Sequence, residues 1–239
     1  MLSDPPRQHA QLGELFDIIA GKLEGPTHPV VDILSLAHLD TLAKALGLSL
    51  NDTSMYRLAW TWGCETPLSI SRNEFLNGMS KVLSEVGSSP KGVGSVASDL
   101  KSPMLRFKPW LEKLRNHIDN IDSVLRTDRK MFRKFYRFIF KWVQSPETMT
   151  RNGSELGMNI KTAVELWHML FPSYWPFEHL EQWVTFCTTE KLFAREVISR
   201  DLWEQLLEFT QITDYSAYNV CDAWPSAIDD FVEHVRSKG

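Results

Sequence analysis

Apolar residues recur along the chain at the three- and four-residue spacing of amphipathic helices. In the first segment they stand at positions i, i+3, i+4, i+7 and i+11, namely Leu12, Leu15, Phe16, Ile19 and Leu23. The same spacing returns in the segments 36–46, 55–62, 75–83, 110–121, 132–143, 163–170, 183–192, 202–209 and 224–235. An apolar stripe of this period marks a helix that buries one face. The pattern therefore predicts roughly nine or ten helices and an all-α fold.

Polar residues at the predicted helix starts support this division. Ser71 and Glu74 have the S-x-x-E spacing of a capping box, in which each side chain accepts a hydrogen bond from the other residue's backbone N–H. Ser199 can cap the helix that follows it. Residues 158–160 and 197–198 are typical of short strands, so we expect at most one two-stranded pair, in the C-terminal lobe.

A Gly/Ser-rich stretch at residues 87–98 separates two groups of predicted helices, and we interpret residues 87–104 as a linker or insertion. The helices then form an N-terminal lobe at residues 12–86 and a C-terminal lobe at residues 105–239. Residues 1–11 are polar and contain prolines, so we expect a flexible N-terminus.

The segment from Gly63 to Glu74 has the length of an EF-hand loop and lies between two predicted helices. Ile70 stands at the eighth position, where the loop's short strand takes an apolar residue, and Glu74 stands at the twelfth, the position of the bidentate ligand. The first position is a glycine, the fifth is Pro67 and the sixth is Leu68, so too few carboxylates remain to bind calcium. The sequence predicts an EF-hand-like lobe without a metal, in which Glu74 serves the capping box.

Composition narrows the class of protein. Of 239 residues 43% are apolar and 23% are charged, which excludes disorder over most of the chain, and nine Trp with thirteen Phe predict an aromatic core. Three cysteines cannot pair evenly and none stands in a C-x-x-C spacing, which favours a reducing compartment over a disulfide scaffold. No apolar run is long enough to span a membrane, and the first residues carry no lipidation signal. Common enzyme motifs are absent too, so we expect no catalytic residues, no cofactor and no metal site.

The charge is distributed unevenly, although the chain carries only −4 in total. Residues 101–141 hold twelve Lys or Arg against four Asp or Glu, a net charge of +8, whereas residues 199–239 hold three against eight, a net charge of −5. Aromatic residues interleave the basic positions from 133 to 142, as in some nucleic-acid-binding proteins. Four apolar residues there share one helical stripe, which favours a buried core instead: Phe135, Phe138, Ile139 and Trp142. The acidic C-terminal segment favours a docking surface for a basic partner.

Residues 223–233, Ala-Trp-Pro-Ser-Ala-Ile-Asp-Asp-Phe-Val-Glu, resemble the terminal signature of the PONY domain in the defective-in-cullin-neddylation family. Three further segments resemble the family in the same order: Leu58-Ala-Trp60, Phe135-Tyr-Arg-Phe138, and Ser199 to Leu207. The resemblance covers about residues 12–236, so the two lobes together would form one PONY domain.

The resemblance implies an all-helical fold with an EF-hand-like N-terminal lobe. Members of the family are scaffold-type ligases that hold a cullin and a charged conjugating enzyme together, so that the ubiquitin-like neddylation modifier passes to a cullin lysine. This chain would then act by proximity, without a nucleophile of its own. Its expected partners are the C-terminal winged-helix domain of a cullin and the N-acetylated conjugating enzyme. We expect a monomer in cytoplasm and nucleus, with no membrane or nucleic-acid partner.

The resemblance also implies two binding sites. A patch of two aspartates and a small alanine would bind the cullin and corresponds to Asp201, Ala223 and Asp229. An apolar pocket would bind the acetylated N-terminal methionine of the conjugating enzyme, and it corresponds to Met55, Leu58, Ala59, Leu68, Trp142 and Met169. Acetylation suits such a pocket because a charged amine is costly to bury.

Two other functions compete with this one. An EF-hand-like helical adaptor would keep the apolar pocket but bind another partner, with no role in neddylation. A helical nucleic-acid-binding protein would use residues 101–141 and would bind DNA or RNA in a salt-dependent way.

Overall fold

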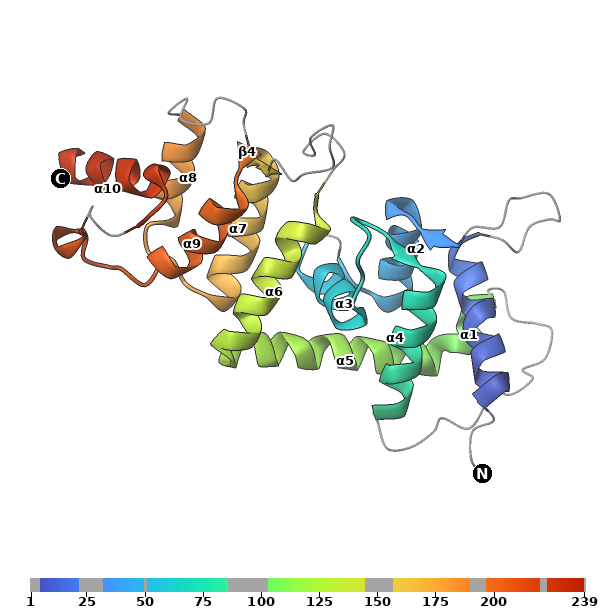
Figure 1. Cartoon of the computed structure of the whole chain (residues 1–239). Helices are drawn as coiled ribbons and strands as arrows, with labels where there is room; N and C mark the ends of the chain where they lie inside the picture. The colour runs from blue at the N-terminus through green and yellow to red at the C-terminus, as the bar shows by residue number, and fades with distance from the viewer. Residues whose placement is uncertain are drawn as a thin grey trace. The chain divides into compact units, whose positions relative to one another are not determined.

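The computed structural model describes residues 5–21, 32–49, 51–85, 103–144, 157–189, 197–219 and 223–238. Most of the predicted linker, residues 86–102, lies outside this part of the chain, as do Cys221 and Asp222. The described residues are helical apart from two short strand pairs, which confirms the all-α prediction (Figure 1). Backbone contacts divide the chain into unit 1, residues 1–124, and unit 2, residues 125–239. No helix within the described ranges is long and apolar enough to cross a lipid bilayer.

Unit 1 contains two successions of helix, short strand and helix, followed by a long helix. The helices are α1 (Pro5–Ile19), α2 (Leu36–Leu46), α3 (Ser54–Trp62), α4 (Arg72–Glu85), the 3-10 helix η1 (Pro103–Phe107) and α5 (Lys108–Thr127), whose last residues belong to unit 2. Helix α4 packs against α1 and α3. The ring of Phe75 joins these three helices, because it meets the rings of Phe16 and Trp62 edge-to-face, each at 5.4 Å between centroids.

The division between the units falls later than the predicted boundary at residues 87–104, because η1 and most of α5 interact with the preceding helices. Arg106 forms an ion pair with Glu14 of α1. Arg115 donates hydrogen bonds to the carbonyl oxygens of Leu46, at 3.0 Å, and Gly47, at 2.6 Å, where α2 ends. These contacts place residues 103–124 with unit 1.

In the described part of unit 2, five α-helices and the 3-10 helix η3 (Tyr215–Ala217) surround an aromatic core. The helices are α6 (Arg129–Trp142), α7 (Ile160–Tyr174), α8 (Leu180–Thr189), α9 (Arg200–Phe209) and α10 (Ser226–Lys238). Helix α9 packs against both α6 and α10, and α7 packs against α8.

The centre of unit 2 is a stack of three buried rings, one each from α6, α7 and α9. Tyr136 lies parallel to Trp203 at 4.2 Å between centroids, and Trp167 stacks on Trp203 at 5.8 Å. Each buried indole N–H has an acceptor on Tyr136: Trp167 donates to its hydroxyl and Trp203 to its backbone carbonyl, both at 3.1 Å. Truncating such a ring to alanine costs about 3–5 kcal/mol, so this stack fixes α9 against α6.

The strands confirm one expectation and correct another. In unit 2, β3 (Met158–Asn159) pairs antiparallel with β4 (Val197–Ile198), as predicted. In unit 1, β1 (Ile33–Leu34) pairs with β2 (Ile70–Ser71). The sequence predicted at most one strand pair, in the C-terminal lobe, so this part of the prediction was wrong. The sequence gives no sign of β1 because two residues are too few to show the alternation that identifies a strand.

Candidate functional site

Helix α9 carries three carboxylates along one side. Asp201, Glu204 and Glu208 stand at i, i+3 and i+7, so they form one row on the helix. Ser199 begins the helix as its N-cap, because its hydroxyl accepts a hydrogen bond from the Leu202 N–H at 3.1 Å, as predicted. The row therefore starts at the positive end of the helix dipole, where a carboxylate is favoured.

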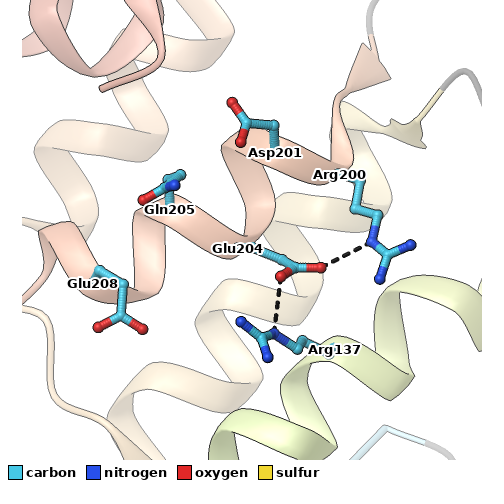
Figure 2. A pocket seen from close by; sticks show the side chains of 6 residues that line it. All are labelled: Arg137, Arg200, Asp201, Glu204, Gln205 and Glu208. Carbon is cyan, nitrogen blue, oxygen red and sulfur yellow. Dashed lines mark hydrogen bonds and ion pairs between the residues drawn. The ribbon is translucent and has the colours of Figure 1, made fainter. Parts of the chain in front are cut away.

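Two of these carboxylates are paired with arginines. Glu204 forms ion pairs with Nε of Arg137 on α6 and with Nε of Arg200 on α9, both at 2.8 Å (Figure 2). Glu208 forms an ion pair with Nε of Arg133 at 2.7 Å and accepts a hydrogen bond from its Nη2 at 2.8 Å. The basic face of α6 is thus compensated by acids of α9, which argues against the predicted alternative of a nucleic-acid surface on this helix.

Asp201 differs from its two neighbours. It is exposed, and it forms no ion pair with any residue that the structure describes. Figure 2 shows its carboxylate directed away from the two arginines that flank Glu204. A groove of about 440 Å³ passes between these side chains and is lined by Arg137, Arg200, Asp201, Glu204, Gln205 and Glu208.

The other predicted cullin-binding residues lie at the start of α10. Ala223 is exposed, and Asp229 is half-buried in the first turn of the helix. The hydroxyl of Tyr218 donates a hydrogen bond of 2.6 Å to Oδ1 of Asp229. Tyr218 itself rests against the ring of Trp224 at 6.3 Å between centroids. This hydrogen bond orients the Asp229 carboxylate, and the sequence alone did not predict Tyr218.

Helices α9 and α10 both belong to unit 2 and are in contact. At this contact Phe209, the last residue of α9, meets Phe231 of α10 edge-to-face at 6.1 Å between centroids. Asp201 lies at the opposite end of α9, in the same unit as Ala223 and Asp229.

The residues predicted for the acetyl-peptide pocket belong to both units. On α3, Met55, Leu58 and Ala59 are buried, and the following Leu68 is half-buried with a φ of 48°. In unit 2, Trp142 is buried and Met169 is half-buried. A separate groove of about 520 Å³ in unit 1 is lined by other residues, including Leu46, Met104, Leu105 and Leu111. The acetyl-peptide pocket stays a prediction for binding experiments.

The loop from Gly63 to Glu74 is closed by its own last residue. Oε2 of Glu74 accepts from the backbone N–H of Ser71 at 2.6 Å and from its hydroxyl at 2.7 Å, while Oε1 accepts from the N–H of Glu65 at 2.8 Å. The Glu74 N–H bonds to the Ser71 hydroxyl at 3.3 Å, which confirms the capping box. Among the described residues no group of three His, Cys, Asp or Glu is placed to hold a metal ion.

The apolar stripe of α6 belongs to the core, as predicted. Phe135, Ile139 and Trp142 are buried, and the half-buried Phe138 stacks on Trp142 at 6.1 Å. The aromatic residues of this basic segment are therefore not available to stack on bases.

Two of the three cysteines are small core residues. Cys64 and Cys187 are free thiols and are buried. Burial raises the pKa of both thiols, and the nearby Glu74 carboxylate raises the pKa of Cys64 further. A protonated, buried thiol is a poor nucleophile, so neither cysteine is suited to carry a transferred group.

These features describe an all-helical protein with a row of three acids on α9, and the comparisons with known families assign its class. The sequence model of a family described as cullin binding matches residues 113–234, slightly more than half of the chain, and the match includes Asp201, Ala223 and Asp229. The chain belongs to this cullin-binding family, whose curated members include proteins named defective in cullin neddylation.

Relatives from several organisms are similar over most of the chain. DCN1-like protein 3 of Drosophila melanogaster is 22% identical over 230 residues, which cover 96% of this chain and 57% of the relative. Defective in cullin neddylation protein 1 of Caenorhabditis elegans is 25% identical over 217 residues, 83% of this chain and 62% of the relative. DCN1-like protein 3 of Xenopus laevis is 29% identical over 178 residues, 74% of this chain and 48% of the relative. The aligned regions span about half to three fifths of these curated relatives.

Proposed function

We propose that this chain binds the C-terminal winged-helix domain of a cullin with Asp201, Ala223 and Asp229. The family match includes all three residues, and relatives carry names that refer to cullin neddylation. In the proposed complex, both carboxylates accept hydrogen bonds from lysine or arginine side chains of the cullin. The small side chain of Ala223 lets the two surfaces approach closely.

The observation that carries this proposal is the unequal pairing of the acids on α9. Glu204 is paired with two arginines, whereas Asp201 is exposed and has no ion-pair partner within the described residues. A carboxylate in this state binds a basic partner without first breaking an internal ion pair. Complementary charge of this kind also speeds the encounter between two proteins.

We further propose that the chain is a scaffold-type co-ligase in neddylation. It would hold the cullin and the charged conjugating enzyme together, so that the ubiquitin-like modifier passes from the enzyme to a cullin lysine. Fixing two reactants in a favourable geometry is enough to accelerate such a step strongly. The buried Cys64 and Cys187 take no part in this scheme.

The conjugating enzyme would be recognised by its acetylated N-terminus. The proposed pocket residues are mostly apolar, so a free ammonium group there would lose its hydration without gaining a counter-charge. A competition experiment with acetylated and free N-terminal peptides tests this part of the proposal. We expect clear preference for the acetylated peptide, and equal affinities would contradict it.

The co-ligase activity is tested by reconstituting transfer from the charged conjugating enzyme to a cullin, with and without the purified full chain. We expect the chain to increase the initial rate, and we expect Asp201→Ala combined with Asp229→Lys to abolish the increase. The matched control is Asp230→Lys, which reverses the charge of an exposed neighbouring residue of α10. Equal rates with and without the wild-type chain would overturn the proposal.

A further inference from the structure

We propose that Arg137 and Arg200 determine specificity at the cullin-binding surface by occupying Glu204. Of the three carboxylates that line the groove, only Asp201 is then open to a basic side chain of the partner. This inference rests on the proposed function. It explains why Arg137 and Arg200, which are positively charged, lie within a surface that we propose binds a positively charged partner.

Both carboxylate oxygens of Glu204 contact these arginines. Its Oε2 forms an ion pair with Nε of Arg137, and its Oε1 accepts a hydrogen bond from Nε of Arg200, both at 2.8 Å. Only 24% of the Glu204 side chain is exposed. A lysine or arginine of the partner would have to displace one of these guanidinium groups before it could bind Glu204.

Glu208 is closed in a similar way by Arg133, whose Nε and Nη2 contact the two carboxylate oxygens. The Nη2 contact is a charge-assisted hydrogen bond, which is stronger than one between neutral groups. Asp201 has no such partner in the described part of the chain, and Figure 2 shows it turned away from Arg137 and Arg200.

This arrangement selects one binding register. At about 1.5 Å of rise per residue, Glu204 and Glu208 lie about 4.5 Å and about 10.5 Å along the helix axis from Asp201. Three open carboxylates at such intervals would let a basic side chain dock at several positions. When arginines neutralise Glu204 and Glu208, only the position at Asp201 favours a basic side chain. The surface is then specific because the other docking positions are disfavoured.

The test is a double-mutant cycle with the isolated winged-helix domain of a cullin as the probe and the full chain as the receptor. Asp201→Asn is made in the wild-type background and in a background with Arg137→Gln and Arg200→Gln, which opens Glu204. Arg200→Gln alone is a milder background, since half of the Arg200 side chain is exposed. Arg133→Gln is the matched control, because it opens only the more distant Glu208. Affinities are measured at two salt concentrations, and melting temperatures confirm folding.

We expect Asp201→Asn to lower the affinity by about tenfold or more in the wild type, as is usual for a hydrogen bond between charged groups. In the background with both arginines changed, the loss should shrink to less than about threefold, because Glu204 accepts the same basic side chain. In the Arg200→Gln background, Asp201→Asn should cost an intermediate amount of affinity. In the Arg133→Gln background it should cost nearly as much as in the wild type, because Glu208 lies about 10.5 Å along the helix axis from Asp201 and replaces it poorly. Binding by the double-glutamine protein should also become more sensitive to salt.

The possible failures are distinguishable. If the wild-type chain does not bind the winged-helix domain, the proposed function fails and the inference fails with it. If the wild type binds but Asp201→Asn costs the same in every background, only the inference is overturned. A loss of affinity caused by Arg200→Gln alone would also overturn it, because the arginine would then contact the partner directly.

Discussion

Glu74 and Asp122 of unit 1 and Asp201 of unit 2 use their carboxylates in opposite ways. In unit 1, Glu74 accepts three hydrogen bonds that close a loop, and Asp122 forms an ion pair with Arg57, of which only 7% of the side chain is exposed. In unit 2, Asp201 faces the solvent at the start of α9. The same chemical group is structural in one unit and available for binding in the other.

The difference shows why the charge of a segment is a poor guide to its function. Residues 101–141 have a net charge of +8, yet Arg133 and Arg137 of this segment pair with acids of α9. The acids that remain open are identified by their lack of a partner, and only the folded structure gives that information. Four substitutions test this contrast, in order of decreasing expected effect.

Asp122→Ala should cause the largest loss of stability, because it leaves a buried guanidinium without its carboxylate. Removing one partner of a buried pair costs about 3–5 kcal/mol. Chemical denaturation of the wild type and the variant measures the loss. The control is Asp40→Ala, which removes an exposed pair with Lys44 and should change the free energy of unfolding by less than about 0.5 kcal/mol. Equal small effects of the two variants would show that Asp122 is not structural.

Asp201→Asn should behave in the opposite way to Asp122→Ala. We expect a loss of about 2 kcal/mol in the free energy of cullin binding, with the free energy of unfolding changed by less than about 0.5 kcal/mol. Calorimetric titration and thermal melting of the same preparation measure the two quantities. Asp230→Asn, on the exposed face of α10, should leave both unchanged. A clear drop in melting temperature for Asp201→Asn would place this residue among the structural acids.

Glu74→Gln should destabilise unit 1 by about 1 kcal/mol, because the amide replaces a charged acceptor of three hydrogen bonds with a neutral one. Calcium should change the melting temperature of neither protein, since the first and fifth loop positions lack ligands. Melting curves with added calcium and with a chelator test both statements. A calcium-dependent rise in the wild type that is lost in Glu74→Gln would show that the loop binds the metal.

Tyr218→Phe should have the smallest effect, a loss of about 0.5–1 kcal/mol in cullin binding with little change in stability. The phenol orients Asp229 through a hydrogen bond of 2.6 Å, and its removal leaves the carboxylate in place but less fixed. Asp229→Asn, measured by the same titration, removes the charge of the carboxylate, whereas Tyr218→Phe changes only its orientation. Comparing the two variants separates these contributions to cullin binding. An effect as large as that of Asp229→Asn would mean that Tyr218 contacts the cullin itself.

Features that depend on neighbouring residues could be predicted from the sequence. The helices follow from apolar spacing, and the Ser71–Glu74 capping box follows from a three-residue interval. The sequence also predicted that residues 158–160 pair with residues 197–198, and the structure adds the register, with Met158 opposite Ile198.

Features that depend on the path of the chain could not be predicted. Ile33 pairs with Ser71 through a two-residue strand that carries no pattern of its own. Tyr218 lies outside α10, so its contact with Asp229 does not follow from the spacing of residues along that helix. The ion pairs between α6 and α9 leave a weak signal in the sequence. Arg133 and Arg137 are four residues apart, and so are Glu204 and Glu208. This matched interval of opposite charge is a signal that two helices lie side by side.

The central claim is that the acids at the starts of α9 and α10 bind a cullin and do not support the fold. The most direct test is calorimetric titration of a cullin's winged-helix domain into the wild-type chain and into the variant with Asp201→Ala and Asp229→Lys, alongside their melting temperatures. We predict measurable binding by the wild type, no detectable binding by the variant, and melting temperatures within a few degrees of each other, since exposed and half-buried polar positions contribute little to stability. Unchanged affinity in the variant, or loss of binding together with a collapsed melting temperature, would contradict the claim.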